Sequence, residues 1–562
     1  MSRRAWRWAL WIALLWLAAA TRLPHANWDA GIAAHPDERF LLSVARQVAF
    51  WGDPLAVEAT FPYGHFALYL ARLLVVADPR AEVLFAARLF SGLIGVLLVA
   101  QAGAWGRLLA GERGAWCAAL LMALAPFPIQ QARFYTVDPL AACFAGLALL
   151  VAVRRQYFVA GILAGWTLAC KISLIWLGVP LFAVALWQAG AFPHLGKIQL
   201  RWNYAREALV ALGRYFRRCW PTLWRIGLGS VVGFVEVSPW AVLRFQQAWK
   251  GPLTQAAMVA GRLDYPYTRQ YADTTPYLYP LGQMALWGLG PLVTLLGAAG
   301  VLYALWHWKR LSGVARIAWV WTWVYFLMTA ALYVKFPRYL LPLYPFWAAW
   351  VAWLIWGREG ARFRRWRWAL TAATAGVTAL FGVAQLSIYA LPHPWETASR
   401  WVYDHVPTDA IVATEHWDHP LPVPLGGGLS SWRYQRKTLP VFDGESRQKL
   451  EVLEMALRDA DAIILASRRG YGALVRLPER YPETLAWYRQ LFTLPHRRRV
   501  DVMRCPRVGP LALMDDPLAD AGLPTERSLA ERCGTPFALR LPRLDESFHV
   551  YDAPTVTLFV KP

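Results

Sequence analysis

Long apolar runs with almost no charge alternate with short basic stretches along residues 1–390. A helix needs roughly 20 apolar residues to cross about 30 Å of hydrocarbon. The pattern therefore predicts a polytopic α-helical membrane protein with about eleven spans. The predicted spans are 6–23, 83–105, 114–128, 137–153, 157–170, 172–189, 223–243, 283–305, 317–334, 339–356 and 368–390.

The segment that ends at Lys171 is the shortest of these. Only 15 residues separate Arg155 from Lys171, which is about 22 Å of helix at 1.5 Å per residue. A single helix over 157–189 would move the basic loop at 190–225 to the side opposite the other basic loops. We therefore expect a short hairpin with Lys171 at its outer tip, where a lysine should face a cavity or a partner rather than lipid.

Three other stretches break the apolar pattern. Two long outer loops, 24–82 and 244–282, mix aromatic and charged residues, which is typical of helices in the membrane interface. Residues 391–562 contain shorter segments: "AIVATEHW", "DAIILASRR" and "RRVDVMRC" predict strands, and 396–405 and 446–459 predict helices. We expect a transmembrane domain over 1–390 and an α/β domain over 391–562.

The charge distribution predicts the topology. Residues 391–562 hold 22 basic and 22 acidic residues, so the whole excess of +22 lies in residues 1–390. Basic loops at 190–225 and 357–367 place the N-terminus in the cytoplasm. The C-terminal domain is then extracytoplasmic, and the chain is a multi-pass protein of the plasma (inner) membrane. This distribution argues against a nucleic-acid partner. In that compartment Cys505 and Cys533 could pair, and no cysteine spacing is typical of zinc.

The chemistry is expected on the outer side, because ten of the fourteen acids of residues 1–390 fall there. "HPDERF" places Asp37 and Glu38 just after the first span. Such a pair could supply a general base and a metal or hydrogen-bonding group, and it equally fits a solvated helix N-terminus. "QARFYTVDPL" adds Arg133, Tyr135 and Asp138, and Asp138 before a proline also fits a helix N-cap.

Three cations and two further residues complete the candidate site. Arg88, Lys171 and Arg338 stand at outer boundaries, where cations can neutralise a lipid-linked phosphate or reach for the interface. Glu236 lies inside a predicted span, and an acid there is either paired or in contact with substrate. His65 follows in the first outer loop.

Together these motifs resemble those of the GT-C membrane glycosyltransferases, in the branch of the protein O-mannosyltransferases and lipid A aminoarabinose transferases. The resemblance covers about residues 1–390: an acidic pair after the first span, "ARFYTVDPL", "CK" at a short hairpin and a late "RYLLPLYPF". It implies an inverting transfer of a hexose or pentose from a polyprenyl-phosphate donor, at the outer face.

The resemblance also implies roles for individual residues. Asp37 corresponds to the catalytic base, with Glu38 beside it and Asp138 as a second acid. Arg88, Lys171 and Arg338 correspond to the cations near the donor phosphate. Candidate substrate contacts are His65, Arg133, Tyr135 and Glu236. The mannosyltransferases carry a His-Pro-Pro run where this chain has "FPYGHF", so the acceptor stays open between protein, lipid and glycan.

No cofactor is required by the sequence, although a divalent metal ion is compatible with it and Glu38 is a candidate ligand. The sequence contains no phosphate-binding glycine loop, which argues against a nucleotide-sugar donor bound in the cytosol. The expected partners are the lipid-linked donor, the extracytoplasmic acceptor and membrane lipid. Two alternatives remain: a transporter of a lipid-linked or envelope substrate, and a non-catalytic scaffold for envelope assembly. A transporter would carry charges near mid-membrane in paired repeats, whereas here the charges cluster at the outer boundary and no repeat is visible.

Overall fold

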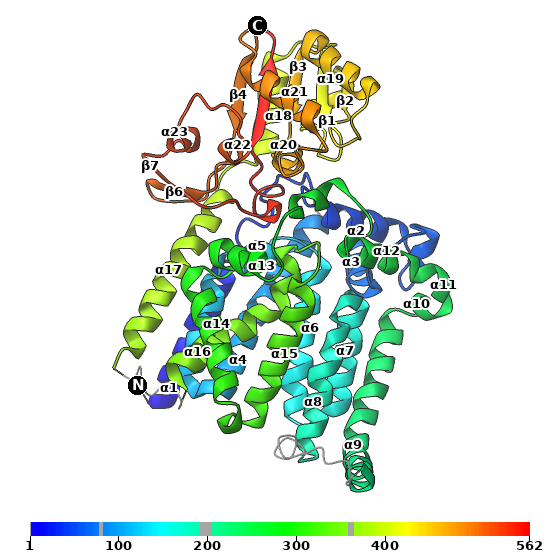
Figure 1. The fold of residues 1–562 in the computed structure, drawn as a ribbon, viewed down its shortest axis with the longest axis vertical. Coiled ribbons are helices and arrows are strands. Elements are labelled where there is room, and N and C mark those ends of the chain that lie inside the picture. Colours follow the sequence, from blue (N-terminus) through cyan, green and yellow to red (C-terminus); the bar gives the residue numbers. More distant parts are fainter. Residues whose placement is uncertain (1, 78–82, 191–204, 358–364) are drawn as a thin grey trace.

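A bundle of apolar helices forms the larger part of the molecule, and a region that contains all the described strands covers one end of it (Figure 1). The computed structural model describes residues 2–77, 83–190, 205–357 and 365–562. Parts of the basic loops predicted at 190–225 and 357–367, and of the outer loop 24–82, lie outside these ranges. The N-terminus lies at the end of the bundle away from the C-terminal region (Figure 1).

The helices of the bundle each overlap a predicted apolar run. They are α1 (Arg3–Ala20), α4 (Val83–Leu124), α6 (Val137–Val153), α7 (Tyr157–Cys170), α8 (Gly178–Gln188), α9 (Ala205–Val237), α14 (Pro291–Trp306), α15 (Gly313–Ala330), α16 (Tyr344–Trp356) and α17 (Arg367–Ile388). The two runs predicted at 83–105 and 114–128 form one element, α4, whose backbone leaves the helix at Gly111 with φ 73°. Its two arms touch, since a Cβ on Gly106 would lie 2.5 Å from the Gly114 carbonyl oxygen.

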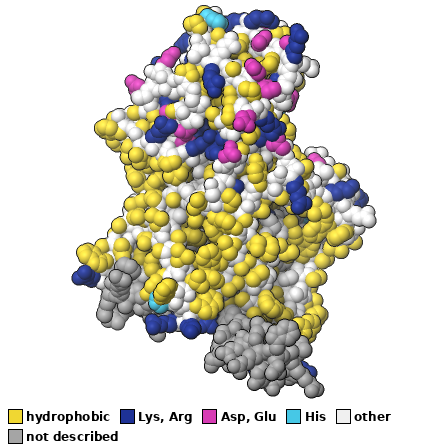
Figure 2. Space-filling model, viewed as in Figure 1, with side chains coloured by type: hydrophobic (Ala, Val, Ile, Leu, Met, Phe, Trp, Pro, Cys, Tyr) yellow, Lys and Arg dark blue, Asp and Glu magenta, His cyan; other side chains and the backbone are white. Residues whose placement is uncertain are grey.

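Three helices of the described residues are long and apolar enough to cross a membrane by length and composition: α4, Pro337–Trp356 and α17. Others are apolar but shorter; α7, for example, has 14 residues. The chain is therefore a mostly helical membrane protein, and the number of eleven spans remains a prediction. On the face shown in Figure 2, apolar side chains cover most of the bundle, whereas charged side chains gather on the C-terminal region, on one upper flank of the bundle and at its opposite end.

Short helices connect the bundle helices, and those labelled in Figure 1 lie at the end of the bundle nearer the C-terminal region. They are α2 (Pro36–Gln47), η1 (Pro54–Ala56), α3 (His65–Ala77), α5 (Pro126–Gln131), η2 (Ile172–Leu177), α10 (Trp240–Leu243), α11 (Phe245–Ala248), α12 (Lys250–Val259), η4 (Pro266–Tyr271), α13 (Leu278–Gln283), η5 (Met284–Gly288), η6 (Trp308–Arg310) and η7 (Pro337–Leu343). Much of the two predicted outer loops is thus helical.

The C-terminal region contains a five-stranded sheet of order β2-β1-β3-β8-β4. Strands β2, β1 and β3 are parallel, and β8 runs antiparallel to both β3 and β4. The strands and helices of this unit are α18 (Pro394–His405), β1 (Ile411–Glu415), η9 (Ser431–Arg433), β2 (Gln435–Leu439), α19 (Arg447–Asp459), β3 (Ala462–Leu465), α20 (Arg469–Leu474), α21 (Pro482–Thr493), β4 (Arg498–Val502) and β8 (Val556–Val560). The three predicted strands and two predicted helices are among them.

Helices cover both faces of this sheet because its inner strands are apolar on both sides. In β3, Ala462 and Ile464 belong to the apolar cluster that includes α18, whereas Ile463 and Leu465 belong to the cluster that includes α19 and α21. Successive side chains of a strand point to opposite faces. A continuous apolar run of strand length therefore indicates a strand buried on both sides.

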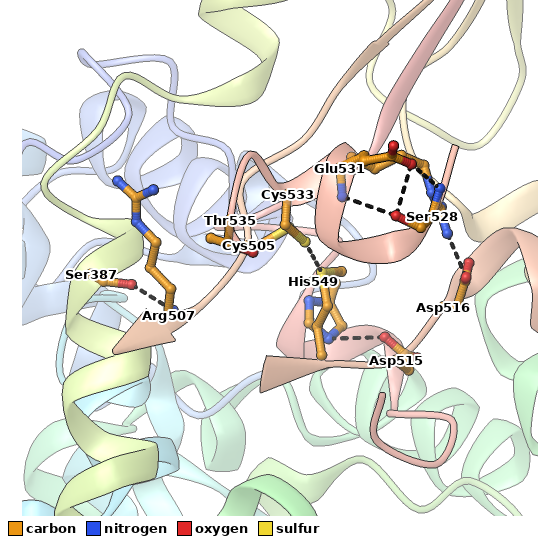
Figure 3. Close-up of a disulfide and its surroundings, with 12 residues drawn as sticks. Ser387, Cys505, Arg507, Asp515, Asp516, Ser528, Glu531, Cys533, Thr535 and His549 are labelled. Atoms are coloured by element: carbon orange, nitrogen blue, oxygen red, sulfur yellow. Dashed lines mark hydrogen bonds and ion pairs between the residues drawn. A yellow bond between two sulfur atoms is a disulfide. The ribbon is translucent and has the colours of Figure 1, made fainter. Parts of the chain in front are cut away.

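A second, three-stranded sheet and a disulfide lie beside it. The sheet has the order β5-β6-β7. Its elements are β5 (Arg507–Val508), β6 (Leu511–Met514), α22 (Pro517–Asp520), α23 (Leu529–Cys533), β7 (Phe537–Arg540) and η10 (Glu546–Phe548). Cys505 and Cys533, 28 residues apart, form the disulfide that joins the segment before β5 to the end of α23 (Figure 3).

Buried polar contacts fix the C-terminal region on the bundle. One carboxylate oxygen of Asp552 accepts hydrogen bonds from Gln130 Nε2 at 2.9 Å, from Gln385 Nε2 at 3.1 Å and from the Tyr389 hydroxyl at 2.6 Å. A buried carboxylate is tolerated only when such partners replace water. The backbone N–H of Arg507 also donates to Ser387 Oγ on α17 (Figure 3). The region is thus positioned above the connecting helices that hold the site.

Candidate functional site

A cavity of about 440 Å³ opens at the end of the bundle that faces the C-terminal region. Most of its wall is apolar, with Leu168, Phe234, Trp249 and Leu332 among the lining residues. Towards the bundle surface the wall includes Ile175 and Met328, whose exposed fractions are 60% and 43%. The cavity therefore suits a ligand with an apolar chain.

Four charged side chains meet at one end of this cavity: Asp37, Asp138, Lys171 and Arg338. Lys171 Nζ lies 2.5 Å from Asp138 Oδ1. Arg338 Nη1 lies 3.0 Å from Asp37 Oδ2, and its Nε lies 3.9 Å from Asp138 Oδ2. We call these four residues the cavity cluster. Their side chains are between 6% and 19% exposed, so they are poorly hydrated but reachable from the cavity.

Each member of the cavity cluster stands at the end of a helix. Asp37 lies in the first turn of α2, where Pro36 starts the helix and His35 Nδ1 accepts the Asp37 backbone N–H at 3.3 Å. Asp138 lies in the first turn of α6, where the helix dipole stabilises its negative charge. The N-cap of α6 is Thr136 and not Asp138, so the N-cap expectation for Asp138 is wrong.

The two cations lie where helices end or change type. Lys171 follows the last residue of α7 in extended conformation and precedes η2, which agrees with a short turn at this place. Arg338 follows Pro337 at the start of η7. Lys171 Nζ also lies 4.1 Å from the centroid of the Tyr339 ring, which stabilises a poorly hydrated ammonium.

The environment of Asp37 keeps it ionised. Burial raises the pKa of its carboxyl, but the Arg338 guanidinium and the Tyr63 hydroxyl outweigh burial, and the pKa lies below its ordinary value. The carboxylate of the adjacent Glu38 does not join this group, because it pairs with Arg88.

Glu38 and Arg88 belong to a second, closed group with Asp29. The Arg88 guanidinium donates to both carboxylates, with Nη2 at 2.7 Å from Asp29 Oδ2 and from Glu38 Oε2, and all three side chains are fully buried. Glu38 also accepts the Tyr135 backbone N–H at 3.0 Å. We call Asp29, Glu38 and Arg88 the buried cluster. Because it does not line the cavity, Arg88 and Glu38 are not part of the proposed site, contrary to the sequence-based expectation.

The remaining candidates are distributed unevenly. His65 lines the cavity. Tyr135 is buried and its hydroxyl donates to the Ala67 carbonyl oxygen, and Arg133 donates to the Thr21 and Arg22 carbonyl oxygens. Glu236 is exposed and does not line the cavity. Of these four, only His65 is placed to contact a substrate in the cavity.

The donor set does not favour a metal held by several side chains. Within the described residues, no group of three or more His, Cys, Asp and Glu side chains is arranged to bind a metal ion. The two carboxylates of the cavity cluster already face Lys171 and Arg338, and Glu38 faces Arg88. We therefore assign no step of the chemistry to a metal.

Sequence reasoning missed the tyrosines of the site. Tyr63 and Tyr339 line the cavity beside the charged residues. Tyr551, from the C-terminal region, packs its ring 4.4 Å from the His35 ring. Tyr63 and Tyr339 each lie within a motif that had been noted for a neighbour, His65 or Arg338. Tyr551 carries no local signal, because only the tertiary fold brings it to α2.

Comparison with known proteins gives a likeness of fold only. No family model and no curated protein matches the chain. Among solved structures, the oligosaccharyltransferase AglB from Archaeoglobus fulgidus, in complex with an inhibitory peptide and a dolichol-phosphate, is similar with a TM-score of 0.47 at 15% identity, over 86% of this chain and 72% of that one. ArnT from Cupriavidus metallidurans, bound to undecaprenyl phosphate, gives 0.45 at 14% identity, over 84% of this chain and 95% of that one. Both are enzymes of the GT-C fold, and at these scores the likeness carries no argument about function.

Proposed function

We propose that this protein is a glycosyltransferase that moves a sugar from a polyprenyl-phosphate donor to an acceptor hydroxyl outside the cytoplasm. One observation carries the proposal: a largely apolar cavity ends at the cavity cluster. A lipid-linked phosphate matches this arrangement, because it has an apolar chain and an anionic head. Burial of the chain supplies binding free energy, while the cations of the cavity cluster compensate the phosphate charge.

The donor phosphate belongs beside Lys171 and Arg338. Lys171 carries three N–H donors and uses one towards Asp138. Arg338 carries five, of which Nη1 and Nε face carboxylates. Both cations therefore keep donors for phosphate oxygens, and Asp138 holds them in position. Such prearranged cations stabilise the negative charge that grows on the phosphate as the sugar leaves.

Asp37 is the general base of this proposal. It removes the proton from the acceptor hydroxyl, whose oxygen attacks the anomeric carbon from the face opposite the phosphate. The new bond joins that carbon to the acceptor oxygen, and the bond to the phosphate oxygen breaks. The products are the glycoside with inverted configuration, polyprenyl phosphate and a protonated Asp37. No other reactant is needed, since the phosphate has already activated the sugar.

The disulfide supports the extracytoplasmic location of the C-terminal region. Disulfides persist in oxidising compartments and are rare in the cytoplasm, and Cys505–Cys533 is the pair that the structure joins. Protein from intact cells is denatured and treated with a maleimide-polyethylene glycol. Reduction before this treatment should allow two further adducts to form and should therefore increase the shift in mobility. Shifts of the same size without reduction would contradict this location.

A transfer assay tests the function. The purified protein in lipid nanodiscs is incubated with radiolabelled polyprenyl-phosphate sugars and a membrane extract as the source of acceptors. We expect label in a new product and an equal amount of free polyprenyl phosphate. A transporter would move the intact donor between vesicle compartments without splitting it, and that result, or an intact donor after incubation with every sugar tested, would overturn the proposal.

A further inference from the structure

A row of aromatic side chains leads from the cavity cluster to the surface of the C-terminal region. The Arg338 guanidinium lies 4.7 Å from the centroid of the Phe336 ring. The Tyr267 ring stacks at 6.4 Å from Phe336 and at 5.6 Å from Tyr265. The Trp417 ring lies 6.4 Å from Tyr267 and 6.3 Å from Tyr265. We call Phe336, Tyr267, Tyr265 and Trp417 the aromatic row.

Trp417 at the outer end of the row is held in an unfavourable conformation. It follows β1 with φ 65°, in the left-handed region that a bulky side chain rarely adopts. Half of its surface is exposed, at 50%. Burial of the indole therefore offsets only part of the conformational free energy that this φ costs. Strain of this kind persists where the surrounding structure imposes it, often at functional sites.

Three contacts connect Trp417 to the helix that carries Asp37. Arg469 Nη1 donates to the Trp417 carbonyl oxygen at 3.0 Å. The same guanidinium lies 5.9 Å from the Tyr551 ring, which packs on His35, the N-cap of the helix that carries Asp37. The backbone of Trp417 is thus connected, through Arg469 and Tyr551, to the N-cap of the helix that carries the proposed base.

We propose that Trp417 and Tyr265 form a subsite that binds a sugar ring of the acceptor. This proposal rests on the proposed function, and it names the substrate class: the acceptor is a saccharide or carries one. The C–H face of a pyranose is weakly positive and apolar, so it packs on the negative face of an aromatic ring. The Trp417 side chain is half exposed, so its indole N–H can be reached by a sugar hydroxyl.

Two polar residues that follow Trp417 in the chain are held in place by hydrogen bonds. Asp418 follows Trp417 and accepts a hydrogen bond from the Ser467 hydroxyl. His419 Nδ1 lies 2.8 Å from Arg39 Nη1 on α2. Carbohydrate recognition needs both a flat apolar surface and fixed polar groups, because each hydroxyl that leaves water must find a new partner. A peptide acceptor would instead favour a strand edge or an apolar groove, and the aromatic row is neither.

Saturation-transfer NMR on the full-length protein in nanodiscs tests the subsite with defined probes. The probes are methyl glycosides of glucose, mannose and N-acetylglucosamine, and a capped Ser/Thr tetrapeptide. Wild type should give saturation transfer to at least one glycoside and none to the peptide. Trp417→Ala should weaken glycoside affinity by about tenfold, the size of one lost aromatic contact. The matched control is Trp432→Ala in the same region, where the indole is 91% exposed and the signal should persist.

A second variant separates binding from folding. Trp417→Gly removes the indole and also the steric cost of the left-handed conformation, since glycine adopts it freely. We expect the melting temperature to stay at or above that of wild type while the glycoside signal is lost. A melting temperature several degrees lower would show that the indole serves packing. That result would overturn the proposal, as would an unchanged signal in Trp417→Ala, an equal loss in Trp432→Ala, or binding of the peptide alone.

Binding of undecaprenyl phosphate distinguishes this inference from the function on which it rests. Trp417→Ala should leave that binding unchanged, whereas Lys171→Ala should weaken it and keep the glycoside signal. If wild type binds glycosides but not undecaprenyl phosphate, the proposed donor is wrong. If it binds undecaprenyl phosphate but no glycoside, only the saccharide subsite is wrong.

Discussion

The buried cluster and the cavity cluster contain the same chemical groups, two carboxylates with arginine or lysine, but differ in what surrounds them. In the buried cluster all three side chains are fully buried, and the Arg88 guanidinium pairs with the carboxylates of both Asp29 and Glu38. In the cavity cluster Arg338 and Lys171 are 15% and 19% exposed and line a cavity. The first has no capacity left for a ligand, and the second retains donors for one. Ion pairs alone do not identify a site; access does.

The difference is sharpest between two adjacent residues. Asp37 and Glu38 both stand in the first turn of α2, yet they point into different clusters. Neighbouring residues on a helix are about 100° apart around its axis. An acidic pair in a helical turn is therefore rarely a pair in space, and here one member anchors the loop at Asp29 while the other faces the cavity.

The largest expected effect concerns stability and the buried cluster. Arg88→Met leaves two fully buried carboxylates without their cation, and breaking a buried ion pair in this way costs about 3–5 kcal/mol. We expect the protein to lose its folded form, measured by gel filtration and by the melting temperature. Arg107→Met in the same helix is the control, because the Arg107 side chain is 53% exposed and such a surface pair, here with Glu112, contributes about 0–1 kcal/mol. Equal stability of the two variants would show that the buried cluster is not structural.

The second prediction separates Asp37 from Glu38 by activity. Asp37→Asn keeps the size of the side chain and removes the base, so transfer should fall by about 10²–10⁴-fold while the donor still binds. Glu38→Gln should lower the melting temperature but leave the activity per folded molecule within a few-fold of wild type.

Asp53→Asn is the matched control for Asp37→Asn, since Asp53 lies in the same predicted loop and pairs with Arg244 at 2.9 Å outside the cavity. It should retain full transfer. If Asp37→Asn stays active and Asp138→Asn does not, Asp138 is the base.

The third prediction concerns donor binding by the cavity cluster. Lys171→Ala removes a charged donor to the phosphate, and a hydrogen bond to a charged group contributes about 1.5–3 kcal/mol. The affinity for undecaprenyl phosphate should fall by about ten- to a hundred-fold. Arg244→Ala, which removes a cation outside the cavity, should leave that affinity unchanged. An equal loss of affinity in both variants would show that Lys171 acts only through the overall positive charge of the protein and not through a contact with the phosphate.

The helices and the sheet could be predicted because their pattern is local. Apolar runs such as 137–153 coincide with a helix, and the run in β3 coincides with a strand. The two spans predicted at 83–105 and 114–128 correspond to the two helical arms of α4, which meet at the break at Gly111. Helices were expected in the loop 24–82, but the bounds of α3 were not predicted, because its 13 residues lie in a stretch rich in aromatic residues.

The candidate site could be predicted only where charge interrupts an apolar run. Asp138, Lys171 and Arg338 stand at such interruptions, and the structure brings them together with Asp37. Arg88 shows the same local signal but meets Asp29 and Glu38 in the fold. Which cation reaches the cavity depends on tertiary packing, and so does the approach of Trp417 from residues far along the chain.

The smallest expected effect is a shift in pH dependence. Burial raises the pKa of Asp37, but Arg338 and its other neighbours outweigh burial and hold the pKa below its ordinary value, which is about 3.9 for an aspartate. Asp37 therefore stays an ionised base well below neutral pH. The stability that this carboxylate contributes is present above the pKa of the unfolded chain and is lost as the pH falls through the lower pKa of the folded state.

Arg338→Gln removes the principal opposing charge but leaves the burial of Asp37 in place. The pKa of Asp37 should then rise, and the acid limb of kcat/KM, which reports groups of the free enzyme, should move to higher pH than in wild type. The residual activity of the variant is measured between about pH 4 and 8, with Arg244→Gln as the control whose acid limb should not move. Overlapping acid limbs in wild type and Arg338→Gln would mean that another group sets the acid limb, and the assignment of the base to Asp37 would then lose its electrostatic support. A shift of the acid limb in Arg338→Gln but not in Arg244→Gln would place the base in the cavity cluster, where Arg338 pairs with Asp37. It would exclude Glu38, because that carboxyl pairs with Arg88 and its pKa depends on Arg88 and not on Arg338.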